Sequence, residues 1–302
     1  MRRRFFLIAN PGAGLTGSPL VEDVSEALRH AGASVTAVRP ASLQAARHAA
    51  AEAAASARYD AIVAAGGDGT VRQVAASLIG SDIPLGLVPV GTGNVLAHEI
   101  GLAGNAEAIC NTLLNGPSIS AACARVNSEP FLLMAGAGFD GRVIAALDHR
   151  FKSYLGKAAY AGPMLGALVR PMDALAVTVD GRRHEASWAV IANARHYGGR
   201  FVMAPRAGIQ ARGLEAILFK AKSRAVLVSQ LMSLAGGTLH ARCASHGDVE
   251  MLACSRVTVT SHNPVPAQID GDAFGSTPLE IDEGVGHLRL IVPADPAPLT
   301  FH

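Results

Sequence analysis

The sequence has little net charge and no extended tract of one sign. Among its 302 residues, 26 Lys or Arg nearly balance 24 Asp or Glu, and no basic cluster follows Arg2, Arg3 and Arg4. Surfaces that bind nucleic acid concentrate positive charge on one face or in one tail. We therefore expect no nucleic-acid partner.

Long apolar runs are also missing. The nearest approach to the ~18 apolar residues of a membrane span is Gly156 to Val169, which Lys157 and Pro163 interrupt. The opening MRRRFFLIAN resembles the start of a secretory signal, but its apolar part stops at Asn10-Pro11, about half the usual length. We predict a first β-strand there and a cytoplasmic protein, with at most peripheral contact at the inner face of a membrane.

Cysteine is scarce and widely spaced. Cys110, Cys123, Cys243 and Cys254 form no CxxC pair, and the 11 histidines show no metal-ligand spacing such as HExxH. These patterns favour neither a disulfide framework nor a zinc site. Reduced thiols in the cytosol are the simplest interpretation.

Hydrophobic residues make up half of the chain, enough for two domain cores. Residues 1–118 alternate short apolar runs with Ala-rich helix-period segments, which predicts a doubly wound, mostly parallel α/β sheet. The expected strands there are Phe5–Ala9, Ser34–Val38, Ala61–Ala65 and Leu85–Val88. Residues 119–292 are β-rich, with an Asp180-Gly181 turn and helices near 155–169 and 224–235, which predicts a second, mostly antiparallel domain.

Three turns rich in glycine or proline follow strands of the first domain. Backbone N–H groups at such turns approach phosphate oxygens closely, and helix N-termini attract anions, so three of them at one sheet edge indicate a nucleotide site. Each turn alone is equally well explained as a tight connection. A Walker A loop is set aside, because Gly12–Ser18 has the glycine spacing but no Lys. The candidate nucleotide-binding residues are Asn10, Pro11, Gly12, Ala13, Gly14, Gly66, Gly67, Asp68, Gly69, Thr70, Gly91, Thr92 and Asn94.

Asp68 stands between glycines in a strand-to-helix turn. A carboxylate beside phosphates would be repelled unless it binds Mg²⁺ or fixes the loop by hydrogen bonds. Its alternative role is that of a helix N-cap near Thr70. A GxGxxG pattern at Gly136–Gly141 lies too far along the chain, and without the expected acidic ribose ligand, to indicate a dinucleotide site.

Asp270 and Asp272 flank Gly271 late in the chain. On an extended segment both side chains would point to one side, so that one could orient Mg²⁺ while the other accepts a proton from an attacking hydroxyl. The alternative is an Asp-Gly hairpin turn. A second open question concerns residues 154–169, which could touch an anionic membrane or simply pack as a helix.

These motifs, in this order, resemble those of the diacylglycerol kinase catalytic-domain superfamily, which includes bacterial lipid kinases, sphingosine kinases and ceramide kinases. The resemblance rests on Asn10–Gly14, Gly66–Thr70, Pro89–Asn94, Gly136–Asp140 and Ile269–Asp272, and it covers nearly the whole chain. It implies an N-terminal domain like those of NAD kinase and phosphofructokinase, which residues 293–302 would complete, and a C-terminal β-sandwich for the lipid.

By this resemblance the activity would be transfer of the γ-phosphate of Mg-ATP to a hydroxyl of a lipid such as diacylglycerol or a sphingoid-like lipid. Asp272 would be the proton acceptor, with Asp68 and Asp270 catalytic beside it, and Asp140 would contact the substrate. Three residues depart from the family pattern. Asp272 stands where the family usually has Glu, and Val95 stands where diacylglycerol kinases place Asp. Arg212 stands where bacterial relatives carry an Asp that is linked to a structural Mg²⁺.

Two other functions stay open. The first is an NAD kinase, which shares the Gly66–Thr70 motif, although its GSTAY-type signature is not seen. The second is a lipid- or nucleotide-binding regulator with weak or no catalysis, which the residues Arg212 and Asp272 motivate. The sequence also leaves open whether the chain forms a homodimer.

Overall fold

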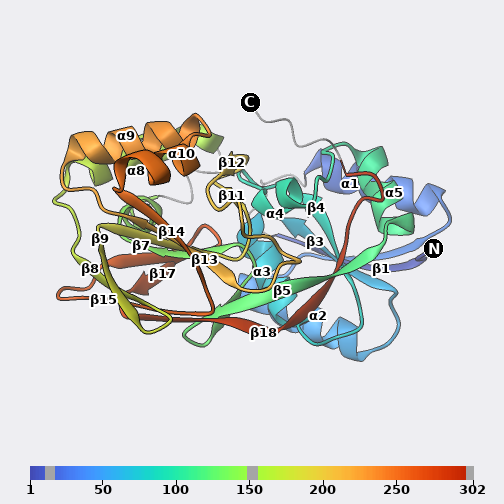
Figure 1. Cartoon of the computed structure of the whole chain (residues 1–302). Helices are drawn as coiled ribbons and strands as arrows, with labels where there is room; N and C mark the ends of the chain where they lie inside the picture. Colours follow the sequence, from blue (N-terminus) through green and yellow to red (C-terminus); the bar gives the residue numbers. More distant parts are fainter. Residues whose placement is uncertain (11–17, 148–155, 297–302) are drawn as a thin grey trace. The chain divides into compact units, whose positions relative to one another are not determined.

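The computed structural model describes residues 1–10, 18–147 and 156–296 (Figure 1). Its contacts divide the chain into two compact units. Unit 1 comprises Met1–Ala122 and a stretch that begins at Gly286, and unit 2 comprises Cys123–Val285. The boundaries fall within two strands, β5 (Ser118–Val126) and β18 (Leu279–Ile291).

Unit 1 is built on parallel strands in the order β2-β1-β3-β4. β3 is buried along its whole length, which is typical of a parallel strand that is covered on both faces. Figure 1 shows helices α1 and α5 on one side of these strands and α2 on the other. The strands are β1 (Arg4–Ala9), β2 (Ser34–Val38), β3 (Ala61–Gly66) and β4 (Leu85–Pro89), and the helices are α1 (Pro19–His30), α2 (Leu43–Ala55), α3 (Asp68–Ala76), α4 (Val95–Glu99) and α5 (Ala106–Asn115).

The four strands predicted for this unit are confirmed to within two residues. The end of β18 extends the same sheet, because Leu290 pairs with Leu85 of β4 in parallel. All these parallel strands end at one edge of the sheet, which brings the segments after β1, β3 and β4 together.

Unit 2 consists of two antiparallel layers that enclose a hydrophobic core. One layer joins β18, β15, β8 and β9, and the other has the order β14-β13-β10-β7-β16-β17. β8 alternates buried and half-buried residues, as expected for a strand with one face in a core. The strands are β6 (Glu129–Phe131), β7 (Met134–Ala137), β8 (Leu175–Val179), β9 (Arg182–Ala186), β10 (Trp188–Ala192), β13 (Leu214–Phe219), β14 (Val249–Cys254), β15 (Arg256–Ser261), β16 (Pro266–Ile269) and β17 (Asp272–Ser276).

Helices and a short hairpin complete unit 2. α6 contacts β16, α10 contacts β14, and α8 contacts both α6 and α9. The bounds are α6 (Phe139–Ala145), a 3₁₀ helix at Gly156–Tyr160, α8 (Ala161–Val169), α9 (Arg224–Ala235), α10 (Leu239–His246), β11 (His196–Tyr197) and β12 (Phe201–Val202). The predicted fold class is confirmed, as are the helix at 224–235 and the turn at Asp180-Gly181, where both φ angles are positive.

No helix in the described ranges is both long and apolar enough to cross a bilayer. The four cysteines all lie in those ranges, and none forms a disulfide.

Candidate functional site

The turns after β3 and β4 meet backbone to backbone. A Cβ atom added to Gly67 would lie 3.3 Å from the Cα of Gly91, and one added to Gly91 would lie 3.2 Å from the amide nitrogen of Gly67 and closer still to its Cα. The amide of Val90 also donates a hydrogen bond to the carbonyl of Gly66 (3.2 Å). Only glycine fits at positions 67 and 91. The turns Gly66–Thr70 and Pro89–Asn94 therefore lie against each other at one edge of the sheet.

Asn94 closes the second turn on itself. Its Oδ1 accepts a hydrogen bond from the amide of Gly91 and its Nδ2 donates one to the carbonyl of the same residue, each at 2.8 Å. The backbone of Asn94 is left-handed (φ 47°), a conformation that Asn tolerates better than most residues. The segment that contains Thr92 is therefore held as a fixed loop.

Asp68 joins the two turns. It is the first residue of α3, and its carboxylate accepts hydrogen bonds from the amides of Val95 (3.0 Å) and Leu96 (3.1 Å) at the start of α4. Asp68 is thus not the N-cap of its own helix, a position that Gly67 occupies. The sequence analysis gave two roles for Asp68 beside phosphates: binding Mg²⁺, or fixing the loop by hydrogen bonds. The hydrogen bonds to Val95 and Leu96 are of the second kind.

The remaining predicted nucleotide residues lie at the same edge or outside the described ranges. Thr70 is buried against Gly66, whose added Cβ would come within 2.5 Å of the threonine Cβ. Gly69 lies in the first turn of α3, whose N-terminus carries partial positive charge. Asn10 follows β1, and its amide donates to the carbonyl of Ala65 (2.9 Å). Pro11, Gly12, Ala13 and Gly14 lie outside the described residues.

In unit 2, the predicted extended geometry around Gly271 is wrong. Asp270 and Gly271 form a tight turn between β16 and β17, with φ angles of 49° and 82°. Two successive left-handed residues are the mark of a type I′ hairpin, which the Asp-Gly dipeptide favours over a continuous strand. Asp270 and Asp272 therefore do not lie on one face of a strand.

The two aspartates of this turn differ in their surroundings. Asp270 is buried, and its carboxylate accepts hydrogen bonds from the amides of Leu132, Leu133 and Met134 at 2.9 to 3.0 Å. It fixes the segment between β6 and β7. Asp272 is half-buried at the first position of β17 and pairs with Ile269. The hairpin presents Asp272 at the end of the sheet, while Asp270 points into the protein.

Asp140 is a buried carboxylate on α6. It accepts hydrogen bonds from Gln268 (2.9 Å) and from the amide of Gly141 (2.8 Å). Burial raises its pKa to about 6, against the opposing effect of these hydrogen bonds. The GxGxxG glycines here serve packing: β7, which carries Gly136, lies in an antiparallel sheet, and a Cβ on Gly141 would overlap the backbone of Pro266.

Comparison with known families identifies both halves of the chain. The diacylglycerol kinase catalytic domain matches residues 4–126, and the YegS C-terminal NAD kinase beta sandwich-like domain matches residues 134–292, more than half of the chain. The chain belongs to the diacylglycerol kinase catalytic-domain superfamily. The resemblance predicted from the ordered motifs is thereby confirmed.

Individual relatives within this superfamily are distant. The chain is 29% identical over 247 residues to the uncharacterised protein sll0036 of Synechocystis sp., an alignment that covers 78% of this chain but 55% of that protein. It is 28% identical to a diacylglycerol kinase of Mycobacterium tuberculosis, with 77% of each chain covered. A crystal structure of a diacylglycerol kinase from Bacillus anthracis str. Sterne has the same fold, with a TM-score of 0.76 at 20% identity over 98% of both chains.

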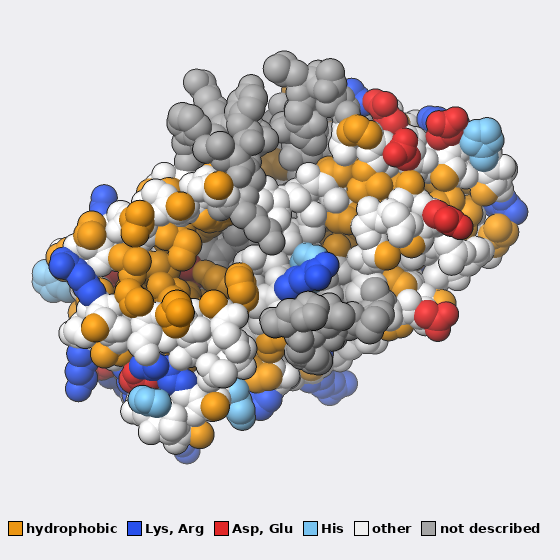
Figure 2. All heavy atoms as spheres, turned by 90° about the horizontal axis from the view of Figure 1, so that it is seen from above, with side chains coloured by type: hydrophobic (Ala, Val, Ile, Leu, Met, Phe, Trp, Pro, Cys, Tyr) orange, Lys and Arg blue, Asp and Glu red, His pale blue; other side chains and the backbone are white. Residues whose placement is uncertain are grey.

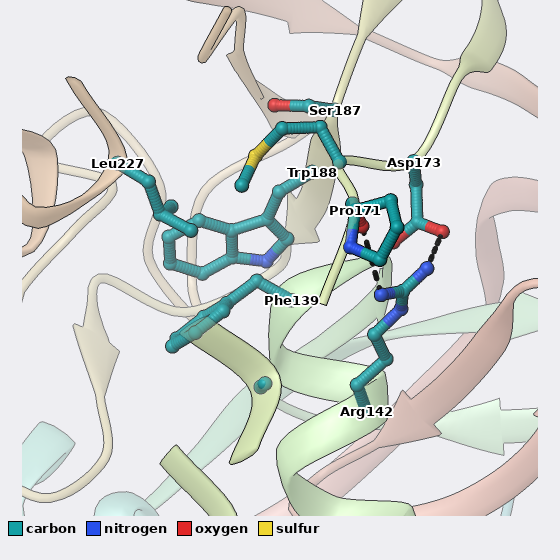
Figure 3. A pocket seen from close by; sticks show the side chains of 9 residues that line it. Phe139, Arg142, Pro171, Asp173, Ser187, Trp188 and Leu227 are labelled. Carbon is teal, nitrogen blue, oxygen red and sulfur yellow. Dashed lines mark hydrogen bonds and ion pairs between the residues drawn. The ribbon is translucent and has the colours of Figure 1, made fainter. Parts of the chain in front are cut away.

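Unit 2 also contains a small pocket that the motifs did not predict. Trp188 forms its centre, with Phe139 and Leu227 beside the indole (Figure 3). Arg142 lies at the same pocket, pairs with Asp173 and donates a hydrogen bond to the carbonyl of Pro171 (3.0 Å). Apart from Phe139, which lies in the Gly136–Asp140 motif, these residues match no motif, and the sequence analysis did not find the pocket.

A second feature concerns the surroundings of Arg212, where the resemblance implied an Asp linked to a structural Mg²⁺. Glu215, which is only 1% exposed, accepts hydrogen bonds from the amide (3.0 Å) and the Nε (2.8 Å) of Arg206. A guanidinium thus neutralises the buried carboxylate three residues after Arg212. In the part of the chain that the structure describes, no group of three or more His, Cys, Asp or Glu is placed to hold a metal ion.

Proposed function

We propose that this chain is an ATP-dependent lipid kinase, which transfers the γ-phosphate of Mg-ATP to a hydroxyl of a lipid such as diacylglycerol or a sphingoid-like lipid. The observation that carries the proposal is the edge where Gly67 and Gly91 meet, tied by Asp68, in a chain of the diacylglycerol kinase superfamily. A backbone surface without side chains beside a helix N-terminus suits a polyphosphate.

The residues of unit 1 would bind and orient the nucleotide. Gly66, Gly67 and Gly69 place backbone without side chains near the N-terminus of α3, and Asn94 holds the loop of Gly91 and Thr92 in place. Preformed donors of this kind lower the cost of ordering a site around the phosphates. Asp68 would act chiefly by holding the starts of α3 and α4 at a fixed distance.

Magnesium would enter as the counterion of the triphosphate. The described residues offer no three-ligand cluster, so the phosphates would supply most of its ligands. Asp68 is the carboxylate nearest in sequence to the glycine turns. A carboxylate has about four lone-pair sites, so the two amide hydrogen bonds do not by themselves prevent a contact between Asp68 and the ion.

Asp272 would accept the proton of the attacking lipid hydroxyl. The hairpin turn at Asp270-Gly271 fixes the start of β17, and Asp270 anchors that turn from inside the protein. The backbone that carries Asp272 is therefore held by the core rather than by a loose loop. Asp270 would act as a positioning residue for this carboxylate.

The test is a pair of substitutions at Asp272, assayed with labelled ATP and a panel of lipids that includes diacylglycerol and sphingosine. Asp272→Asn removes the base and should reduce turnover at least about a hundredfold while leaving the affinity for ATP nearly unchanged. Asp272→Glu keeps a carboxylate and should retain activity. Undiminished lipid phosphorylation by the Asn variant would refute the assigned role.

The same assay distinguishes the other two functions. NAD offered beside the lipids would become phosphorylated if the enzyme were an NAD kinase. Binding of ATP without any transfer to NAD or to the lipids would favour a regulator. Mass spectrometry of the products formed from a total lipid extract would then name the acceptor.

A further inference from the structure

Gln268 is a polar side chain in a buried strand. It lies in β16 and is only 2% exposed, while its neighbours Ala267 and Ile269 belong to the hydrophobic core between the two layers. Because side chains alternate along a strand, Gln268 faces the other side of the sheet, where α6 contacts β16. A buried primary amide needs partners for both its oxygen and its nitrogen. Those partners indicate what the side chain does.

The side-chain amide of Gln268 connects a helix to a turn. Its Nε2 donates a hydrogen bond to Oδ2 of Asp140, and its Oε1 accepts one from the amide of Gly271, each at 2.9 Å. An ionised carboxylate only accepts and a backbone amide only donates, so a single orientation of the side-chain amide satisfies both partners. We call the three groups, on Asp140, Gln268 and Gly271, the Gln268 bridge. It runs from α6 through β16 to the turn that precedes Asp272.

The amide of Gly271 needs this acceptor because of its place in the hairpin. Ile269 and Asp272 are the last pair of the β16–β17 ladder, and Asp270 and Gly271 form the turn between them. Gly271 is half-buried, and a buried amide without an acceptor destabilises the fold. The carboxylate of Asp270 already accepts the amides of residues 132–134. Both turn residues are thus fixed to unit 2, Asp270 through its own carboxylate and Gly271 through Gln268.

The glycine motif at 136–141 brings α6 close enough to form this bridge. Gly136 pairs with Gln268 in the sheet, and a Cβ on Gly136 would overlap the carboxylate of Asp140. A Cβ on Gly141 would overlap the carbonyl of Pro266 in β16. The helix can approach β7 and β16 this closely because glycine occupies both positions. The motif therefore places Asp140 within hydrogen-bond distance of Gln268.

The surroundings of Asp140 keep water away from the bridge. Asp140 is 2% exposed, α8 contacts α6, and hydrophobic side chains gather over the side of the molecule that α8 and α9 form (Figure 2). Of the strands and helices packed against α6, α8, β7 and β16 carry no charged residue, and β17 carries only Asp272. Burial raises the pKa of Asp140 to about 6 and, together with this carboxylate, raises the pKa of Tyr197 well above its usual value. At neutral pH Gln268 therefore donates to a largely ionised carboxylate, which gives a stronger hydrogen bond than a neutral acceptor would.

We propose that Gln268 is a positioning residue, which fixes the turn before Asp272 by linking the amide of Gly271 to the carboxylate of Asp140. The inference rests on the proposed function, since it concerns the placement of the proton acceptor. In this role Asp140 acts through Gln268 and not by contact with the lipid. Without the bridge the turn shifts, and a displacement of about 1 Å at a reacting group lowers turnover about a hundredfold.

The first experiment compares two substitutions of similar shape in the full chain, assayed with labelled ATP and dioctanoylglycerol well below the unfolding temperatures. Gln268→Met removes both hydrogen bonds and should lower kcat about ten- to a hundredfold, while the KM for ATP, whose proposed site lies in unit 1, stays unchanged. Thr277→Val is the matched control. It removes the acceptor of the Val265 amide (3.1 Å) at the opposite end of the β16–β17 pair, so it should lower the unfolding temperature and leave kcat unchanged.

Gln268→Glu tests the link to Asp140 through the pH dependence of kcat. The new carboxylate still accepts the amide of Gly271, and at acidic pH it shares a proton with Asp140, which preserves both hydrogen bonds. At alkaline pH the two carboxylates are both ionised and repel each other. The kcat of this variant relative to wild type should therefore fall about tenfold or more between about pH 6 and about pH 9. The same ratio for Gln268→Met should not change with pH.

Hydrogen exchange at the amide of Gly271, measured without ATP or lipid, separates this proposal from the kinase reaction. Exchange should be about tenfold or more faster in Gln268→Met than in wild type, and unchanged in Thr277→Val. Faster exchange in a chain that phosphorylates no lipid supports the bridge and contradicts the kinase. An active enzyme in which Gln268→Met keeps full kcat, or in which the Gln268→Glu ratio does not change with pH, overturns the positioning role and leaves the kinase proposal intact.

Discussion

A methyl group at Gly91 would enter the contact between the two glycine turns. In the Gly91→Ala variant the new Cβ would lie 2.8 Å from Oδ1 of Asn94 and 3.2 Å from the amide nitrogen of Gly67, and closer to the Gly67 Cα. Carbon atoms pack at about 3.5–4.0 Å, so the turns must separate. The obstacle on one side is backbone, which cannot move aside as a flexible side chain would.

Overpacking of this kind costs about 1–3 kcal/mol. If this edge binds the triphosphate, the nucleotide must bring the separated turns back together. Most of this ~1–3 kcal/mol would then be subtracted from the free energy of nucleotide binding. The dissociation constant for a non-hydrolysable ATP analogue with Mg²⁺ should then rise about 5- to 150-fold. Isothermal titration calorimetry measures this directly, and the unfolding temperature should fall by about 2–4 °C per kcal/mol lost in the free protein.

Gly104→Ala is the matched control, since no atom lies within 4 Å of the added Cβ. It should bind the analogue like wild type and be no less stable. The reasoning fails if Gly91→Ala binds the nucleotide as tightly as Gly104→Ala does. In that case the turn contact would be a packing feature without a role in binding.

Three further predictions concern the carboxylates. Asp68→Ala should speed hydrogen exchange at the amides of Val95 and Leu96 and cost about 1–2 kcal/mol, which urea unfolding measures, because the start of α4 loses its acceptor. Asp270→Ala should lower the unfolding free energy by about 1–3 kcal/mol, since three buried amides lose their partner. The free energy of unfolding should fall as the pH rises through the titration of Asp140. The pKa of Asp140 is about 6 in the folded state and 3.8 in the unfolded state, so the folded state keeps the proton to higher pH. The stability that this proton contributes is therefore present below pH 3.8 and is lost as the pH rises to about 6. Wild type should lose up to about 3 kcal/mol relative to Asp140→Asn between pH 4 and 7, and parallel stability curves for the two proteins would contradict this.

The fold was largely predictable from the sequence, because its signals are local. Buried parallel strands such as Ala61–Gly66 are short apolar runs, and the glycine turns directly follow them. The tie between Asp68 and the amides of Val95 and Leu96 was not predictable, since its partners lie 27 and 28 residues away and backbone amides leave no mark in a sequence.

The hairpin at Asp270 shows a different limit. The alternation of side chains in a strand predicts one common side for Asp270 and Asp272, but the rule holds only while φ stays negative. The Asp-Gly dipeptide favours left-handed backbone, and this local preference decides the geometry. The exposed apolar side chains of α8 were partly visible in the sequence as an apolar segment at 154–169, whereas those of α9 depend on which side of that helix packs inward.

The carboxylate of Asp270 connects parts of the chain that are 136 to 138 residues apart in sequence. Closing so long a loop lowers the conformational entropy of the chain, and the hydrogen bonds of Asp270 offset this loss only when the surrounding sheet is already assembled. We therefore expect the turn before Asp272 to acquire its final shape late in folding. If the proposed function is right, a chain that stalls before this step would hold the glycine edge proposed for the nucleotide and yet lack a positioned Asp272. Recovery of activity after refolding would then trail the recovery of ATP binding.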